Sequence, residues 1–263
     1  MSAYNPDHPP ALKRWGQNFL ADPNYIRKIV AAIDPQPTDR FLEIGPGHGE
    51  LTFPLAERCA TVTAIDIDPL LVADLHTQAP ANVTIVEGDV LAADLESLLQ
   101  PGGRVYGSLP FYIASKIIFR LLDHRSRWPD GYFIVQREVA GRMTAAPGGK
   151  EYGRLSVMLQ AYCKVERIFI LPPTVFRPEP KVESALVRLT PQMPVPEITD
   201  ERLLANVVRA AFGQRRKKLS NALKAVGAGE LAVELGLGDL RAEKVAWEDY
   251  IALANRLAET SAQ

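Results

Sequence analysis

Leu-Glu-Ile-Gly-Pro-Gly-His-Gly-Glu, residues 42–50, decides the fold, because an apolar strand pattern here runs through three glycines into a helical pattern. Glycine tolerates positive φ and lets a ligand approach the backbone, since no Cβ stands in the way. The spacing is G-x-G-x-G, whereas dinucleotide-binding turns use G-x-G-x-x-G. The turn therefore indicates a nucleoside-type ligand, and a glycine-rich turn without a ligand is the alternative.

Short β-branched runs alternate with amphipathic stretches on both sides of this turn, from about residue 20 to residue 190. Such alternation predicts an α/β fold with a parallel, doubly wound sheet. The expected strands are 40–44, 61–66, 83–86, 104–106 and 132–136, and the expected helices between them are 51–58, 69–77, 93–99 and 115–123. A helix at 154–162 and two late strands, 164–170 and 184–189, should close the sheet with a terminal hairpin.

A proline-rich linker at 190–197 separates this pattern from a C-terminal part that looks helical throughout. We expect a domain at 1–192, which begins with a polar, basic arm, and a small α-helical domain at 193–263. The expected C-terminal helices are 201–212, 217–226, 231–235 and 247–258.

Composition excludes several classes of protein. The two cysteines, Cys59 and Cys163, are too few and too far apart for a disulfide scaffold or a CxxC metal site. No apolar run reaches the length of a membrane span, and the N-terminus has no apolar signal segment. The net charge of −1 gives no global sign of a polyanionic partner. We expect a cytoplasmic monomer with no metal and no membrane contact.

Two acidic residues specify the expected ligand further. Asp66 ends the second strand, where a carboxylate can accept hydrogen bonds from both hydroxyls of a ribose. Asp89 ends the third strand, where a carboxylate can accept a hydrogen bond from the amino group of adenine. Asp68 has a local alternative role, as the cap of the helix that begins at Pro69.

The segment Ser108-Leu109-Pro110-Phe111 follows the fourth strand and suggests the chemistry. Proline disfavours the helical conformation at Leu109, so the backbone stays extended and its carbonyls can point into a site. Phe111 offers a flat apolar face. A purine amine is a poor nucleophile, and acceptors on its hydrogens can align its lone pair with a methyl group. This scheme requires neither a metal nor a general base, and a structural turn is the alternative.

One short basic run stands out in the C-terminal part. Arg215, Arg216, Lys217 and Lys218 follow one another, and no acidic residue occurs between Val207 and Lys224. Such a run can contact nucleic-acid phosphates, and a solvated charged helix is the alternative. Residues proposed to extend this surface are Lys13, Arg14, Arg137, Arg142 and Lys181. Trp15, Trp128 and Tyr152 are candidates for stacking on bases, although packing is the commoner role of such aromatic residues.

The chain resembles the KsgA family of ribosomal RNA adenine dimethyltransferases, and the resemblance covers most of its length. The matching segments are 17–20 (QNFL), 42–47 (LEIGPG), 87–89 (EGD), 108–111 (SLPF), 135–140 (VQREVA), 152–156 (YGRLS), 176–184 (FRPEPKVES) and 212–219 (FGQRRKKL).

The resemblance implies a Rossmann-like class I methyltransferase that uses S-adenosyl-L-methionine. It implies dimethylation of the 6-amino groups of two adjacent adenosines in the 3′-terminal hairpin of 16S ribosomal RNA, with a role in small-subunit biogenesis. Phe111 and Phe176 should sandwich the flipped adenine. Glu43 should either face the cofactor's ammonium group or orient the glycine loop. The implied cofactor-binding residues are Asn18, Leu20, Glu43, Gly45, Gly47, Asp66, Asp89 and Ser108.

Two positions depart from the family pattern. Ser108 stands where the family usually has Asn, whose side-chain carbonyl is thought to accept a hydrogen bond from the target amine. A serine hydroxyl also accepts, but it is shorter. Asp66 replaces a commoner Glu, which is a milder change. Two rival functions remain open: a resistance methyltransferase that modifies adenine in large-subunit RNA, and a ribosome-assembly factor without catalysis.

Overall fold

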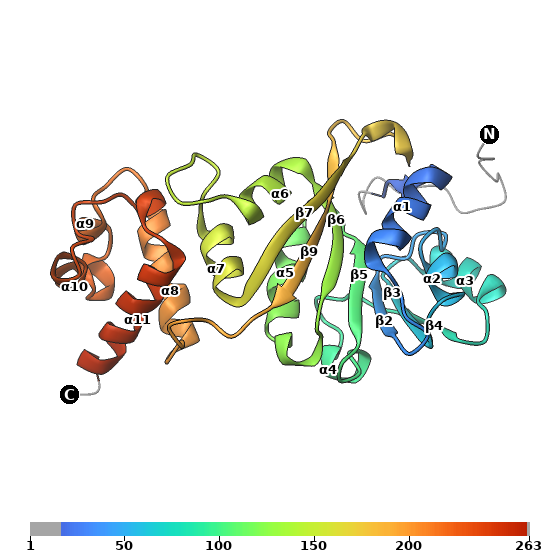
Figure 1. Cartoon of the computed structure of the whole chain (residues 1–263), viewed down its shortest axis with the longest axis horizontal. Helices are drawn as coiled ribbons and strands as arrows, with labels where there is room; N and C mark the ends of the chain where they lie inside the picture. Colours follow the sequence, from blue (N-terminus) through green and yellow to red (C-terminus); the bar gives the residue numbers. More distant parts are fainter. Residues whose placement is uncertain (1–16, 262–263) are drawn as a thin grey trace. The chain divides into compact units, whose positions relative to one another are not determined.

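The computed structural model describes residues 17–261 of the chain, which separate into two compact units (Figure 1). The first, called the sheet unit, is Met1–Ala140 with Glu166–Pro191; the second, called the helical unit, is Gly141–Val165 with Gln192–Gln263. The contiguous ranges 1–192 and 193–263 expected from the sequence differ from these units. Residues 141–165 belong with the C-terminal helices because α7, Arg154–Tyr162, packs on helices α8 and α11 of that part.

A seven-stranded sheet in the order β4-β3-β2-β5-β6-β9-β7 organises the described chain (Figure 1). The pairs from β4 to β6 are parallel, and β9 runs antiparallel to β6. The predicted doubly wound α/β sheet is therefore confirmed, and the two late strands are neighbours at one edge. The strands are β2 (Arg40–Ile44), β3 (Thr61–Asp66), β4 (Val83–Glu87), β5 (Arg104–Ser108), β6 (Gly131–Gln136), β7 (Cys163–Leu171) and β9 (Ser184–Pro191).

The core strands are parallel because their side chains are apolar on both faces, which suits a sheet covered by helices. Val62, Ala64, Val105 and Phe133 are fully buried. The helices of the sheet unit that connect these strands are α2 (Thr52–Ala56), α3 (Pro69–Gln78), α4 (Leu95–Leu98) and α5 (Ala114–Leu122). Parallel connectivity brings the carboxyl ends of β2 to β5 to one edge of the sheet, where ligands bind in folds of this type.

Two helices were not expected from the sequence. The first, α1, spans Pro23–Ile33, and Asp22 caps it by accepting hydrogen bonds from the N–H of Asn24 at 2.7 Å and of Tyr25 at 3.3 Å. An Asp-Pro pair at a helix start is a recognisable signal. The second, α6, spans Arg137–Thr144 and follows β6 directly.

A second, two-stranded sheet pairs segments far apart in sequence. β1, Phe19–Leu20, runs antiparallel to β8, Phe176–Arg177. It places the residues just before α1 beside the loop between β7 and β9.

The helical unit packs around aromatic residues. Tyr152 meets Phe212 edge to face with ring centroids 6.2 Å apart, and Phe212 lies 5.9 Å from Tyr250. Its remaining helices are α8 (Glu201–Gly213), α9 (Leu219–Ala222), α10 (Gly229–Glu234) and α11 (Trp247–Ser261). Within the described part of the chain, no helix combines the length and apolar character that crossing a membrane requires.

Candidate active site

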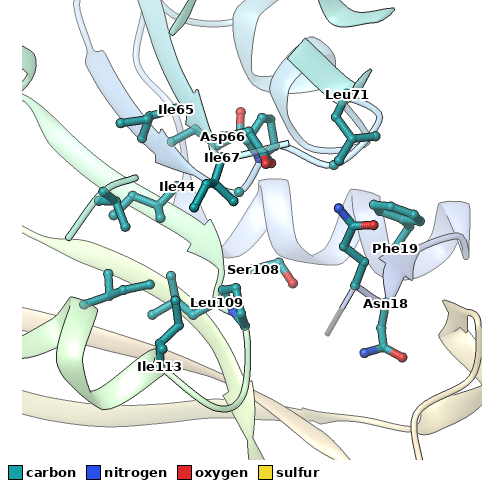
Figure 2. A pocket seen from close by; sticks show the side chains of 18 of the residues that line it. Asn18, Phe19, Ile44, Ile65, Asp66, Ile67, Leu71, Ser108, Leu109 and Ile113 are labelled. Carbon is teal, nitrogen blue, oxygen red and sulfur yellow. The ribbon is translucent and has the colours of Figure 1, made fainter. Parts of the chain in front are cut away.

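A cavity of about 310 Å³ opens at the carboxyl ends of β2, β3, β4 and β5 (Figure 2). Figure 2 shows Asp66 beside Ile67 on one side and Leu109 with Ile113 on the other, with Ser108 between them. All predicted cofactor and catalytic residues line this cavity: Asn18, Leu20, Glu43, Gly45, Gly47, Asp66, Asp89, Ser108, Leu109, Pro110, Phe111 and Phe176. The structure thus brings together residues from across the sheet unit, and their individual roles stay predictions.

The glycine turn packs closely against neighbouring residues, so a larger side chain would collide with them. Gly45 and Gly47 have φ of +72° and +62°, a region that favours glycine. A Cβ on Gly45 would stand 3.2 Å from the Ser108 carbonyl oxygen. A Cβ on Gly47 would stand 3.0 Å from the ring of Phe19. The turn therefore runs closely past both the end of β5 and the segment before α1.

Asp66 and Asp68 have different roles. Asp66 ends β3 in the cavity, and its Oδ1 accepts a hydrogen bond from the N–H of Asp68 at 2.9 Å. Burial raises the pKa of Asp66 to about 6, because the charged carboxylate loses hydration. Asp68 is buried and caps α3 by accepting from the N–H of Leu70 at 3.1 Å. The local role considered for Asp68 is confirmed, and Asp66 is the carboxylate that lines the cavity.

Asp89 lies at the end of β4 and is half-buried. Its Oδ1 accepts a hydrogen bond from the N–H of Leu91 at 2.8 Å, which fixes the side chain at the cavity wall. Within residues 17–261 its second carboxylate oxygen makes no hydrogen bond, so that oxygen can accept one from a ligand.

Glu43 is hydrogen-bonded to two elements that adjoin the glycine turn. Its Oε2 accepts hydrogen bonds from Thr52 Oγ1 at 2.5 Å and from the Tyr106 hydroxyl at 2.7 Å, and the side chain is buried. Burial raises the pKa of Glu43 to about 8, against the lowering effect of these two donors. Because Thr52 begins α2 and Tyr106 belongs to β5, Glu43 ties both elements to β2. Of the two roles open for Glu43, the hydrogen bonds support the second.

The segment 108–111 leaves β5 at the cavity. Figure 2 shows the Ser108 hydroxyl pointing into the open part of the cavity, toward the side lined by Asn18. In the described chain this hydroxyl has no hydrogen-bond partner. The Pro110 carbonyl accepts from the N–H of Ile113 at 3.1 Å and is used in the turn before α5. Leu109 is held by its N–H, which donates to Ile134. Of the Leu109 and Pro110 carbonyls, that of Leu109 has no hydrogen-bond partner among the described residues and can accept from a ligand.

Two aromatic rings line the same cavity from distant elements. Phe111 lies in the turn that precedes α5 and is half-buried, and Phe176 on β8 is 2% exposed. The sequence did not predict the other lining residues, because no local motif marks a side chain as a cavity wall. They include Gln17, Phe19, Ile67, Leu71, Tyr112 and Ile113.

The basic run 215–218 is not on a helix. It forms the turn between α8 and α9, so the expected helix at 217–226 is wrong in its first part. Arg215 donates to the carbonyls of Lys150 at 2.7 Å and Tyr152 at 3.2 Å. Lys218 pairs with Asp239 at 2.7 Å. Both remaining cations, Arg216 and Lys217, are exposed, and no partner contacts them among the described residues.

Some of the proposed extensions of the RNA surface are wrong. Trp128 is 2% exposed and its Nε1 donates to the Leu121 carbonyl, so it is a packing residue. Tyr152 is fully buried against Phe212. Arg137 is exposed and pairs with Glu183. Arg142 and Lys181 are exposed, whereas Lys13, Arg14 and Trp15 lie outside the described residues.

Several known proteins are similar to this chain in sequence and in fold. A family described as Ribosomal RNA adenine dimethylase matches residues 11–259. The Ribosomal RNA small subunit methyltransferase A of Xanthomonas euvesicatoria is 47% identical over 94% of this chain and 96% of its own. A dimethyladenosine transferase from Plasmodium falciparum superposes with a TM-score of 0.81 at 25% identity, covering 92% of this chain and 98% of its own. The 23S rRNA methyltransferase ErmE superposes with a TM-score of 0.69 at 28% identity, covering 92% of this chain and all of its own (100%).

Proposed function

The chain belongs to the ribosomal RNA adenine dimethylase family, and from that premise we propose that it dimethylates two adjacent adenosines in the 3′-terminal hairpin of 16S ribosomal RNA. The protein is a methyltransferase that uses S-adenosyl-L-methionine and acts on ribosomal RNA. One observation carries the finer proposal. The glycine turn, two strand-end carboxylates and the segment 108–111 line a single cavity.

The cavity fits S-adenosylmethionine by the chemistry of its donors and by its shape. Gly45 and Gly47 line the cavity, and because they carry no side chain a ligand can approach the backbone of the turn. Asp66 and Asp89 offer acceptors for ribose hydroxyls and for the adenine amino group, and Asn18 and the backbone near Leu20 complete the wall. When bound, the cofactor supplies an electrophilic methyl group on a sulfonium.

The chain's own residues then hold and orient the target amine. Phe111 and Phe176 provide two aromatic faces for the flipped base. Oxygen acceptors at the Ser108 hydroxyl and the Leu109 carbonyl take hydrogen bonds from the two amine hydrogens. These bonds direct the nitrogen lone pair toward the methyl group and strengthen as the amine pyramidalises. The nitrogen is cationic after the transfer and loses its proton to water, so the residues need only position the amine.

The exposed cations of the 215–218 turn are the proposed phosphate contacts. Arg216 and Lys217 are available, whereas Arg215 and Lys218 have partners within the helical unit. We propose that the small ribosomal subunit is the partner, because the relative with 47% identity is named for it. A monomer acting in the cytoplasm, where such subunits are assembled, is the simplest form of this proposal.

A large-subunit target is the second candidate, because ErmE shares the fold. The lower identity of that match, 28% against 47%, favours the small subunit. A non-catalytic assembly factor is motivated only by Ser108 in place of Asn.

Methyl incorporation into purified subunits that lack the modification tests the proposal. Small and large subunits are incubated separately with labelled cofactor, and primer extension maps the modified nucleotides. We expect two adjacent dimethylated adenosines near the 3′ end of the small-subunit RNA. Subunits that already carry the modification are the matched control and should accept no label. Labelling of large subunits alone would reject the target, and no labelling of either would reject catalysis.

A further inference from the structure

A short segment links the cofactor side of the cavity to the ring of Phe176. Residues 17–21, which we call the strap, precede α1, and residues 17–20 line the cavity. In β1 the strap pairs with β8, so that Leu20 lies directly opposite Phe176. The N–H of Ala21 continues the pairing by donating to the Val175 carbonyl at 2.7 Å. One end of the strap is therefore bonded to the element that carries Phe176.

The other end of the strap reaches the carboxylate assigned to the ribose. Gln17 Nε2 donates a hydrogen bond to Asp68 Oδ2 at 2.9 Å. Asp68 is itself 1% exposed, and its N–H donates to Asp66 Oδ1 at 2.9 Å. One residue thus stands between Gln17 and the Asp66 side chain.

The middle of the strap lies on the glycine turn. The Phe19 ring would stand 3.0 Å from a Cβ on Gly47, and its centroid is 4.2 Å from that of His48. The strap therefore contacts three features in sequence: the Asp66–Asp68 pair, the glycine turn and β8.

We propose that the strap couples the two halves of the site, so that an occupied cofactor side fixes Phe176 where the target adenine stacks. A two-residue strand is marginal by itself, and its pairing depends on how firmly its flanks are held. A ligand that packs on the glycine turn holds Phe19, and the Gln17–Asp68 bond holds the end of the strap. Gln17 is then a positioning residue that acts through β1. The inference rests on the proposed function, because it assigns the adenine to Phe176.

Coupling of this kind is reciprocal, which makes it measurable. The affinity for S-adenosylhomocysteine is measured by calorimetry with and without a saturating RNA hairpin that carries the target adenosines. The ratio of the two affinities should be about 5 or more in the parent protein, the lower range of measured couplings. In Gln17→Ala the ratio should fall below about 2. The ratio compares each variant with itself, so a general loss of cofactor affinity does not imitate the effect.

Matched variants give the comparison. Gln78→Ala removes an exposed glutamine from the end of α3 and should keep the parent ratio. Asp68→Asn keeps an oxygen that can cap α3 and an amide that can pair with Gln17, and it should keep most of the ratio. If Gln17→Ala fails to fold by thermal unfolding, Phe19→Leu takes its place, because it removes the ring from the glycine turn and should also lower the ratio.

A ratio near one in the parent, or a parent-like ratio in a folded Gln17→Ala, overturns the coupling. Methylation of small subunits by a parent with a ratio near one would reject the strap and retain the proposed function. A parent that neither binds nor methylates the RNA would reject both.

Discussion

At the scale of single residues, the chemistry depends on where two hydrogens of an amine find acceptors. The Ser108 hydroxyl points into the cavity and has no hydrogen-bond partner in the described part of the chain. The neighbouring Pro110 carbonyl is used by Ile113, so the Leu109 carbonyl is the backbone acceptor that remains. In the first transfer each acceptor can take one of the two amine hydrogens, and in the second transfer the one remaining hydrogen needs only one of them.

Ser108→Ala should therefore lower the single-turnover rate more than the affinity for cofactor or RNA. A loss of about 1.4 kcal/mol in transition-state stabilisation appears as a tenfold slower rate. Ser108→Asn should retain or raise the rate, because a longer carbonyl acceptor is restored. Parent-like turnover in Ser108→Ala would show that backbone carbonyls alone orient the amine. Activity gained only in Ser108→Asn would show that the parent is a non-catalytic assembly factor.

Asp66 should make cofactor binding depend on pH. Burial raises its pKa to about 6 in the free protein, and the ionised form is the better acceptor for ribose hydroxyls. Affinity for S-adenosylhomocysteine should thus rise as the pH passes upward through about 6. Losing one charge-assisted bond, worth ~1.5–3 kcal/mol, predicts roughly 10- to 100-fold weaker binding below this pH. Calorimetry between pH 5 and 7, below the range in which Glu43 titrates, should show this step in the parent and a weak, flat profile in Asp66→Asn. A step that survives in Asp66→Asn would assign the titration to another group.

At the scale of elements, the four basic residues in the turn between α8 and α9 differ in whether their side chains have partners. Arg216 and Lys217 are exposed, whereas Arg215 supports the backbone of 150–152 and Lys218 pairs with Asp239. Four neighbouring basic residues thus divide into two that can meet phosphate and two with partners inside the unit.

Replacing Arg216 and Lys217 with Gln should reduce the salt dependence of RNA binding. Each lost phosphate contact lowers the magnitude of the log–log slope by roughly 0.7 to 0.9, and cofactor affinity should not change. Lys218→Gln is the matched control, because its exposed pair with Asp239 contributes little and its loss should leave the slope unchanged. Arg215→Gln should instead lower the thermal stability of the helical unit, since two carbonyls lose their donor. A slope unaltered in the Arg216, Lys217 variant would make the turn an ordinary solvated surface.

The same elements show what the sequence could predict. Strands 40–44 and 61–66 were predicted to the residue, because a buried parallel strand needs a short apolar run ended by a turn signal. The helix expected at 217–226 failed at its start, because Lys218 bridges to Arg241 and the Leu219 N–H donates to Leu240. Pairing with residues more than twenty positions away leaves no signal in the sequence around Lys218.

Some residues of the candidate site could likewise be predicted from the sequence, and others could not. The glycine turn, the two aspartates and the segment 108–111 could be predicted, because each follows directly after a strand that the sequence marks. The strap residues Gln17 and Phe19 were noted only through a family resemblance, since their role depends on partners at Asp68 and Gly47.

At the scale of the whole molecule, the chain crosses between its two units more than once. Residues 141–165 leave the sheet unit, contribute α7 to the helical unit, and return in β7. Many of their apolar side chains are buried, and Val157, Leu159 and Ala161 are fully buried. The described residues that line the cavity, in contrast, all belong to the sheet unit.

This division predicts an asymmetric result when the chain is shortened. A chain that ends at Pro191 keeps the whole cavity lining but removes α8 and α11, on which α7 packs. Each buried Val or Leu that becomes exposed costs ~1.5–3 kcal/mol, so α7 should unfold. Limited proteolysis should then cut within 141–165 rapidly, whereas S-adenosylhomocysteine binding should persist at low protein concentration. A shortened chain with 141–165 replaced by a Gly-Ser linker should bind equally well and aggregate less. Equal protection of 141–165 in the full and shortened chains would mean that α7 is stable without the C-terminal helices, and that a single boundary near residue 192 describes the molecule better.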